Sequence, residues 1–345
     1  MTISRIEASW LDSFVQVLDR CAISSTESVV VLTEHQSRAV LVELAELALS
    51  QLKRSYYRIV LPTTVHIDGP LVRSSGASLA LTGQTDVVQA LCKADVVIDL
   101  TVEGLMHAVE TAEILKSGTR IMNVSNEHPE ALSRLVPDDK LKEQVKVAVT
   151  RIREARRMTV ESDAGTALTA DLTDARTVGV WGWTDRPGIL AHWPGGLVVS
   201  FPAANTVNGQ LVLAPGDINL SFKRYIESPV TLTIENDYVT EVQGHGADSA
   251  LMRDYLNSFG DRAAYATSHV GYGLNPAARY EALTLYDRSD TNGTELRAVA
   301  GNFLYSTGAN EFAGRFTRGH FDLPVMNCTI SLDDLIVVKQ GSLVA

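Results

Sequence analysis

The sequence predicts a protein of two parts, an N-terminal α/β domain with a mainly parallel sheet and a C-terminal α+β domain rich in antiparallel strands. Three observations predict this. Short β-branched runs alternate with helical segments in the first part, a long charged helix closes it, and short alternating runs separated by turn residues follow Met158. We therefore expect domains over residues 1–157 and 158–345.

The first domain is expected to contain four strands with helices between them, a Rossmann-like arrangement. No G-x-G-x-x-G follows the first strand, so the dinucleotide-binding fingerprint is absent. One helix is expected to begin near Gly104 and to end at Gly118, where a C-terminal glycine is favoured. The expected strands are residues 29–32, 58–61, 96–100 and 120–124, and the expected helices are residues 36–53 and 104–116.

A helix over residues 138–157 links the two domains, with one apolar stripe at helical spacing and a charged outer face. We interpret that charged face as a solvated surface rather than as a binding patch. The second domain is expected to hold one clear helix, over residues 247–259. Its expected strands include residues 197–201, 211–213, 230–234, 298–305 and 328–330.

Composition excludes several classes of protein. The formal net charge of −11 argues against nucleic acid and against an anionic membrane as partners. The 3 cysteines form no CxxC, so free thiols in a reducing compartment are expected rather than a disulfide framework or a zinc ribbon. The N-terminus lacks a signal-peptide pattern, and no apolar run is long enough to span a membrane. We expect a soluble cytoplasmic protein.

An H-x-D motif at His320 and Asp322 is a candidate metal site. In a strand, residues two apart face the same side, so both side chains could reach one ion. Two histidines and one carboxylate form the ligand set of non-haem iron oxygenases. A second H-x-D, at His66 and Asp68, runs into Gly69 and favours a turn. Local spacing alone does not choose between the two copies.

Two further histidines lie among glycines or aromatic residues. His269 precedes Gly271 and Gly273, which suits close backbone approach beside a metal or ligand, or equally a strand-end turn. His192 stands before Trp193 and Pro194, in a context that suits a flat aromatic ligand or a packed loop.

His107 and Ser306 are weaker candidates. His107 lies early in a helix after a predicted parallel strand, a favoured ligand position in α/β sheets, although a lone helical histidine is more often structural. Ser306 could bond a substrate or simply the neighbouring strand. Neither G-x-S-x-G nor H-E-x-x-H occurs, so the serine hydrolase and zincin classes have no support.

Several stretches together resemble the 2,5-dihydroxypyridine 5,6-dioxygenase family of bacterial nicotinate degradation, part of a larger group with the M29 aminopeptidase fold. They occur in the family's order over nearly the whole chain. The shared stretches are residues 115–120, 192–194, 215–218, 253–255, 268–274, 301–308 and 320–324.

This resemblance implies one ferrous ion, Fe(II), held by His269, His320 and Asp322. It also implies that His192 lies in the substrate pocket and that His107 moves protons. Either His107 or His192 would then take the proton of the ring hydroxyl as general base. A small aromatic substrate, O₂ and a homo-oligomeric assembly are the partners that it implies.

The resemblance further implies that Ser306 contacts the substrate. One position departs from the family. A substrate-contacting glutamate of relatives aligns near Val180, and the nearest carboxylate downstream is Asp185. Because a site built around a carboxylate discriminates sharply, this difference leaves the exact ring substrate open.

The function that the resemblance implies is extradiol-type ring cleavage, with 2,5-dihydroxypyridine as the first candidate substrate and N-formylmaleamate as its product. The alternatives are a dioxygenase for another hydroxylated ring, a metal-dependent aminopeptidase or hydrolase of the M29-like group, and a non-catalytic binding protein. The two-metal peptidases need further glutamate and histidine ligands, which the sequence does not offer beyond the three named residues.

Overall fold

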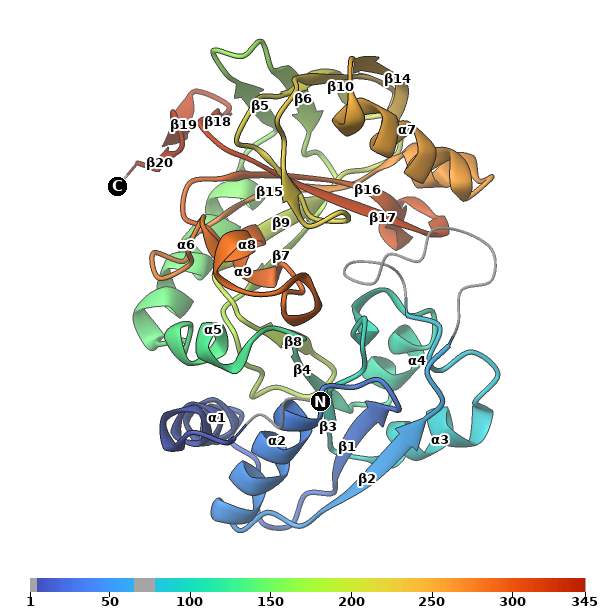
Figure 1. Cartoon of the computed structure of the whole chain (residues 1–345), viewed down its shortest axis with the longest axis vertical. Helices are drawn as coiled ribbons and strands as arrows, with labels where there is room; N and C mark the ends of the chain where they lie inside the picture. Colours follow the sequence, from blue (N-terminus) through green and yellow to red (C-terminus); the bar gives the residue numbers. More distant parts are fainter. Residues whose placement is uncertain (1–4, 65–77, 345) are drawn as a thin grey trace.

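The computed structural model describes residues 5–64 and 78–344. Its two halves lie one above the other in Figure 1, with the parallel sheet in the lower half and two antiparallel sheets in the upper half. Within the described residues, no helix is both long and apolar enough to cross a membrane.

The lower sheet has the strand order β2-β1-β3-β4-β8, and every neighbouring pair is parallel. The expected parallel sheet is therefore confirmed. Its last strand lies beyond residue 157, so the chain returns to this sheet after leaving it, and the boundary at 157 stays a prediction. The strands are β1 (Val29–Glu34), β2 (Tyr56–Leu61), β3 (Val96–Asp99), β4 (Arg120–Val124) and β8 (Leu190–Trp193).

Helices cover both faces of this sheet, which explains why its strands are continuous apolar runs rather than alternating ones. Val29 and Val31 pack in one core with α1 and α2, whereas Val30 and Leu32 pack in another with α3 and α4. The helices of this half are α1 (Ala8–Arg20), α2 (Ala39–Gln51), α3 (Thr85–Lys93), α4 (Thr111–Lys116) and α5 (Pro129–Arg134).

The single helix expected over residues 104–116 is wrong. The chain forms a 3₁₀ turn, η1 (Leu105–His107), then an extended residue, then α4. The buried Asp99 carboxylate at the end of β3 accepts the Leu105 amide at 2.7 Å, and the Thr111 hydroxyl donates to the Leu105 carbonyl at 2.5 Å. These side-chain bonds compete with helical hydrogen bonding, so His107 lies on a turn instead.

The linking helix α6 (Asp139–Glu154) is confirmed, and the Asp138 carboxylate caps it by accepting the Leu141 amide at 2.7 Å. Helix α7 (Ala247–Ser258) is also confirmed. Shorter helices are η2 (Arg262–Tyr265), α8 (Ala282–Leu285), η3 (Arg288–Asp290), α9 (Thr294–Arg297) and η4 (Glu311–Ala313).

The upper half is antiparallel, as expected. One sheet has the order β17-β16-β15-β9-β7. Residues 298–302, expected in a strand, precede β16 instead, because the Asn302 side chain bonds the Leu296 carbonyl and the Gly273 amide across a turn. The strands are β7 (Arg176–Val180), β9 (Leu197–Phe201), β15 (Thr267–Gly273), β16 (Phe303–Asn310) and β17 (Arg315–Val325).

The other antiparallel sheet has the order β14-β13-β10-β6-β5-β18-β19-β20. Its strands are β5 (Arg157–Glu161), β6 (Ala167–Asp171), β10 (Val207–Leu213), β13 (Val230–Glu235), β14 (Tyr238–Gly244), β18 (Thr329–Leu332), β19 (Leu335–Lys339) and β20 (Ser342–Leu343). A separate pair contains β11 (Ile218–Asn219) and β12 (Arg224–Tyr225).

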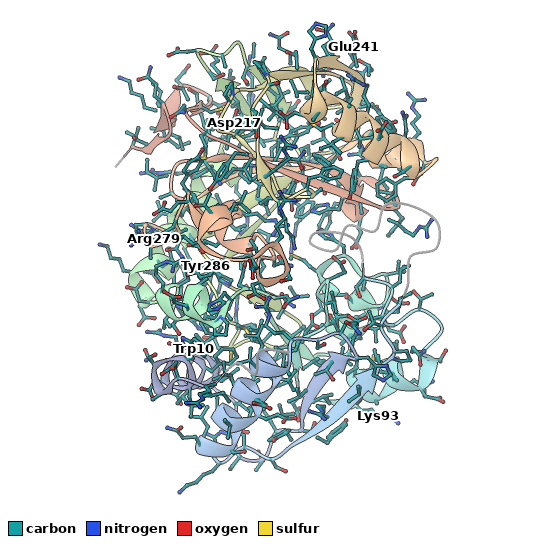
Figure 2. All side chains as sticks on the ribbon, in the orientation of Figure 1. Trp10, Lys93, Asp217, Glu241, Arg279 and Tyr286 are labelled. Carbon is teal, nitrogen blue, oxygen red and sulfur yellow. The ribbon has the colours of Figure 1, made fainter. Side chains whose placement is uncertain are left out.

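Residues 286–297 of the upper half contact the lower half. Tyr286, labelled in Figure 2, accepts a hydrogen bond from Arg134 Nη1 at 3.0 Å, and its ring stacks on His128 with centroids 4.8 Å apart. Arg134 also pairs with Glu295 on α9 at 2.7 Å. The short helix α9 is thus fixed against α5.

Candidate metal centre

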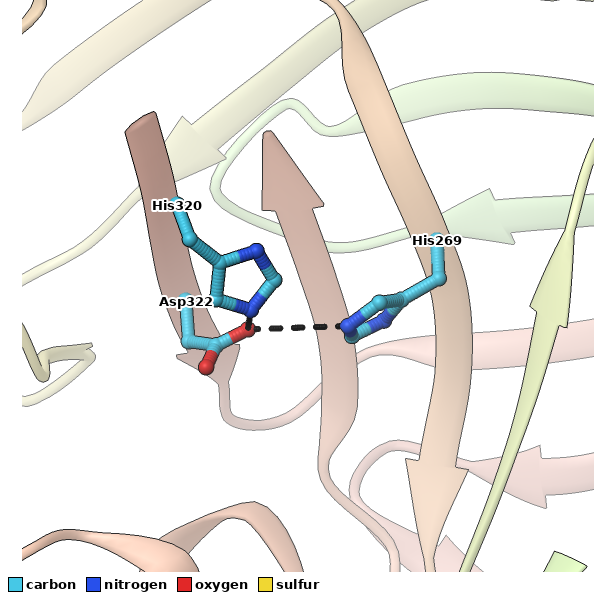
Figure 3. A group of neighbouring side chains, drawn as sticks. All are labelled: His269, His320 and Asp322. Atoms are coloured by element: carbon cyan, nitrogen blue, oxygen red, sulfur yellow. Dashed lines mark ion pairs between the residues drawn. The ribbon is translucent and has the colours of Figure 1, made fainter. Parts of the chain in front are cut away.

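Three side chains predicted to bind metal meet on one face of the five-stranded antiparallel sheet. His269 reaches from β15 toward His320 and Asp322 on β17, across the strand between them (Figure 3). Asp322 Oδ1 lies 3.3 Å from His320 Nε2 and 3.8 Å from His269 Nε2. Each of the three residues has one possible ligand atom, and these three atoms all lie within 4.8 Å of one another.

Strand register explains the meeting. His269 on β15 pairs with Ser306 on β16, and Ser306 pairs with Asp322 on β17, so His269 and Asp322 lie in line across the sheet. His320 stands two residues before Asp322 and therefore faces the same side, so His269, His320 and Asp322 form one row. The expectation that the H-x-D lies on a strand is confirmed. Its second copy, His66 to Asp68, lies outside the described residues.

The row is buried, and burial sets its protonation. Burial lowers the pKa of His269 to about 3, so this imidazole is neutral and has a lone pair for a metal. Burial would raise the pKa of Asp322, but Arg297, His320 and His269 together hold it well below its ordinary range. One carboxylate with two imidazoles is a donor set that suits a divalent transition metal, so the residues fit a ferrous ion.

Arg297 on α9 is a member of the site that the sequence interpretation missed. Its Nε lies 2.5 Å from Asp322 Oδ2, and both side chains are largely buried. No local pattern around residues 294–297 points to this contact, because it depends on how α9 is placed in the fold.

A cavity of about 360 Å³ borders the row. The lower half contributes His107, Asn123 and His192 to its wall, near the carboxyl ends of the parallel strands, where α/β sheets favour ligands. The upper half contributes mainly apolar residues from β7, β9 and β16: Val178, Val180, Leu197, Val199 and Leu304. A flat, partly apolar ligand suits this combination of walls.

His192 on β8 is a cavity residue with a defined tautomer. Its Nδ1 lies 2.7 Å from the Pro194 carbonyl oxygen, which can only accept, so Nδ1 carries the hydrogen. The Trp193–Pro194 peptide bond is cis. Burial lowers the pKa of His192 to about 4. Its Nε2 is therefore a neutral acceptor at ordinary pH.

His107 also lines the cavity, and its ring centroid is 4.3 Å from that of His320. Burial, followed by the neighbouring His320 and His269, lowers the pKa of His107 well below its ordinary value. Both predicted proton-transfer histidines thus lie beside the row as neutral imidazoles.

Ser306 and Val180 occupy different kinds of position. Ser306 is fully buried between β15 and β17, its hydroxyl donates to Asp322 Oδ1, and it is not part of the cavity wall. Val180 is part of that wall. Asp185, the nearest carboxylate downstream, is not, and it lies 3.5 Å from Lys142 Nζ.

Comparison with known proteins gives one consistent result. A sequence profile of the family described as 2,5-dihydroxypyridine 5,6-dioxygenase matches residues 9–345. The 2,5-dihydroxypyridine 5,6-dioxygenase of Pseudomonas putida strain KT2440 is 39% identical over 336 residues, which cover 96% of this chain and 95% of the relative.

Solved structures agree. The 2,5-dihydroxypyridine dioxygenase of Pseudomonas putida KT2440 superposes with a TM-score of 0.92 at 38% identity, covering 99% of each chain. Wild-type AmpT from Thermus thermophilus superposes with a TM-score of 0.59 at 14% identity, covering 97% of this chain and 99% of AmpT. The second likeness shows a shared fold only.

Proposed function

Because the chain belongs to the 2,5-dihydroxypyridine 5,6-dioxygenase family, we propose that this dioxygenase opens the ring of 2,5-dihydroxypyridine with a ferrous ion held by His269, His320 and Asp322. The observation that supports it most is the buried row of two imidazoles and one carboxylate at the wall of a cavity of about 360 Å³. The product would be N-formylmaleamate.

A ferrous ion bound to these side chains would supply reactivity toward O₂ and would favour the anionic form of a coordinated ring hydroxyl. His269, His320 and Asp322 would hold the ion at the cavity wall, within reach of a bound ring. Residues of the two halves would together orient the ring beside these three side chains.

His192 is the proposed acceptor of the ring hydroxyl proton. The Pro194 carbonyl fixes its hydrogen on Nδ1, and its neutral Nε2 is then available as a base. His107, whose ring centroid lies 4.3 Å from that of His320, is the second neutral imidazole and would move a proton later in the reaction.

The two valines of strand β7 set the ring specificity in this proposal. Val178 and Val180 present methyl groups to the cavity, where they would contact the ring rather than bond one of its polar substituents. The predicted substrate contact of Ser306 also stays a prediction. Its bond to Asp322 supports a role in holding that ligand.

The test is anaerobic loading with ferrous ion, followed by O₂-electrode assays over a panel of hydroxypyridines and hydroxybenzoates. We expect O₂ uptake matched to ring opening, with 2,5-dihydroxypyridine the best substrate. Peptide cleavage with zinc or cobalt and no O₂ uptake would instead support the hydrolase alternative.

A second experiment tests the proposed base. His192→Gln should lower kcat by about 10²–10⁴-fold, the usual contribution of a general base, with ferrous ion still bound. His245→Gln is the matched control, since His245 is exposed. Unchanged kcat in His192→Gln would exclude the assignment.

The homo-oligomer and the cytoplasmic location stay predictions.

A further inference from the structure

The two oxygens of the Asp322 carboxylate have different surroundings. Oδ1 faces the two histidines, at 3.3 Å from His320 Nε2 and 3.8 Å from His269 Nε2, and it also accepts the neutral hydroxyl of Ser306. Oδ2 is turned away from them and lies 2.5 Å from Arg297 Nε. The carboxylate is 1% exposed, so neither oxygen is shared with bulk water.

The Arg297 guanidinium is fixed from several sides. Its Nη1 donates to Asn292 Oδ1 and to Thr294 Oγ1, each at 3.3 Å. The Asn302 side chain holds the backbone of the same residue, with Nδ2 3.2 Å from the Arg297 carbonyl. A long, flexible side chain is thereby kept in one orientation.

The helix that carries Arg297 is itself fixed by the other half of the molecule. Glu127, which follows β4 and is 2% exposed, accepts the amide of Gly293 at 2.8 Å and that of Asn292 at 2.9 Å. It also accepts the amide of Glu295 at 3.3 Å. A carboxylate at the start of a helix satisfies amides that have no partner within the helix.

We propose that Arg297 is a positioning residue that restricts Asp322 to ligation through Oδ1, and that Glu127 holds Arg297 in place for this purpose. The inference depends on the proposed metal centre. Under this proposal, Glu127 in the parallel half acts through α9. It controls which oxygen of Asp322, in the antiparallel half, binds the ion.

The chemical consequence concerns the number of open coordination positions. A carboxylate can ligate a metal through one oxygen or through both. If both oxygens of Asp322 bound the ion, one position needed for substrate or O₂ would be filled. The Arg297 guanidinium disfavours that, because its charge-assisted hydrogen bond takes one lone pair of Oδ2 and places a positive charge beside that oxygen. Residues that orient ligands in this way typically affect affinity or activity by about 10–100-fold.

The experiment uses Co²⁺ alone as the probe, because its visible absorption reports coordination number without any turnover. Arg297→Met and Arg297→Gln are each titrated with Co²⁺ beside the unsubstituted protein. We expect Co²⁺ to bind all three, with a changed absorption spectrum in both variants at full occupancy. After ferrous loading to full occupancy, kcat/KM should fall by about 10–100-fold.

Rescue and control variants separate positioning from general stability. Arg297→Lys keeps a charged donor and should restore most of the original spectrum. Arg315→Met is the matched control: it breaks another buried pair, with Asp237 at 2.7 Å, and should lower stability while leaving the spectrum unchanged. Glu127→Gln loses one acceptor and should shift the spectrum in the same direction as Arg297→Met, but by less.

Two results would overturn the inference. One is a Co²⁺ spectrum of Arg297→Met and of Arg297→Gln that is identical to the spectrum of the unsubstituted protein, with activity in proportion to the amount of metal bound. The other, an unchanged spectrum in Glu127→Gln, would remove the link to the parallel half. If the unsubstituted protein bound no Co²⁺ and no ferrous ion, the proposed metal centre itself would fail, and this inference with it.

Discussion

Asp237 and Asp322 are both buried carboxylates beside an arginine in the upper half, yet their surroundings differ. Asp237 is surrounded by hydrogen-bond donors. It accepts the amides of Asn205, Thr206 and Val207 at 2.6, 2.8 and 2.9 Å, and Arg315 Nη1 lies 2.7 Å from it. Asp322, in contrast, accepts the Ser306 hydroxyl and Arg297 Nε, and it directs Oδ1 toward two imidazoles at the wall of a cavity.

The difference separates a structural carboxylate from a ligand. Asp237 has its lone pairs filled by protein donors, so it ties a turn to β17 and has no capacity left for an ion. Asp322 has neutral His269 beside it, and a neutral imidazole has one ring nitrogen with a lone pair that can bind a metal. A metal ion held between the two residues would use that lone pair together with one of Oδ1.

The largest expected effect is at Asp322. Asp322→Ala, like His269→Ala, should abolish ferrous binding, and kcat/KM should fall by about 10³-fold or more because the metal supplies several kcal/mol to the reaction. Anaerobic metal analysis and the O₂ electrode measure the two quantities. Full metal occupancy with full activity in either variant would disprove the ligand assignment.

Asp237 should show the reverse behaviour. Asp237→Asn replaces one carboxylate oxygen by an amide NH₂ group, which is a donor and would face another donor, the Asn205 amide or Arg315. Breaking a buried ion pair in this way lowers the free energy of unfolding by about 3–5 kcal/mol. Urea denaturation measures it. Ferrous ion bound per folded molecule should stay unchanged, and a loss of metal with unchanged stability would contradict the comparison.

Asp217 is an intermediate case with a pH dependence. Its donors are two backbone amides, Ala214 at 2.7 Å and Met326 at 2.6 Å, and burial raises its pKa to about 6. Since the folded state holds this proton more tightly, its stabilising contribution is full below the unfolded pKa of 3.8 and is lost as pH rises through about 6.

The loss should amount to about 3 kcal/mol, at 1.36 kcal/mol for each pKa unit. The measurement is the difference in unfolding free energy between the unsubstituted protein and Asp217→Asn, from pH 4 to pH 7. This difference should move steadily in favour of the variant as pH rises. A difference that does not vary with pH would show that Asp217 is ionised at all these values.

The smallest effect is expected at Asp185, whose partner Lys142 lies 3.5 Å away and whose side chain is one-third exposed. Asp185→Asn should change unfolding free energy by less than about 1 kcal/mol, as for other solvent-exposed ion pairs, and should leave KM for the ring unchanged. A large rise in KM would place this carboxylate at the substrate after all.

Much of this site could be predicted from sequence where one strand or one motif carried the information. The period of two in a strand places His320 and Asp322 on one face. Gly271, after His269, does mark a close approach, but it is to the backbone of the neighbouring strand β9 rather than to a metal or ligand. A side chain at Gly271 would put its Cβ 2.0 Å from the Val198 carbonyl oxygen.

Contacts between distant segments could not be predicted. Arg297 bonds Asp322 from α9, and the start of α9 is bonded by Glu127, which lies 168 residues before Glu295 in the chain. The place of β8 in the parallel sheet could not be predicted either, since its pairing with β4 depends on the whole fold. The turn at His107 was missed because Asp99 and Thr111 bond the backbone there.

The most direct test of the account is the number of ferrous ions bound per chain under anaerobic equilibrium dialysis, measured for the unsubstituted protein and for Asp322→Asn, which keeps the shape of the side chain. We expect a single ion for the former and none for the latter. Equal binding by both proteins would contradict it, because the ion would then lie somewhere other than between His269, His320 and Asp322.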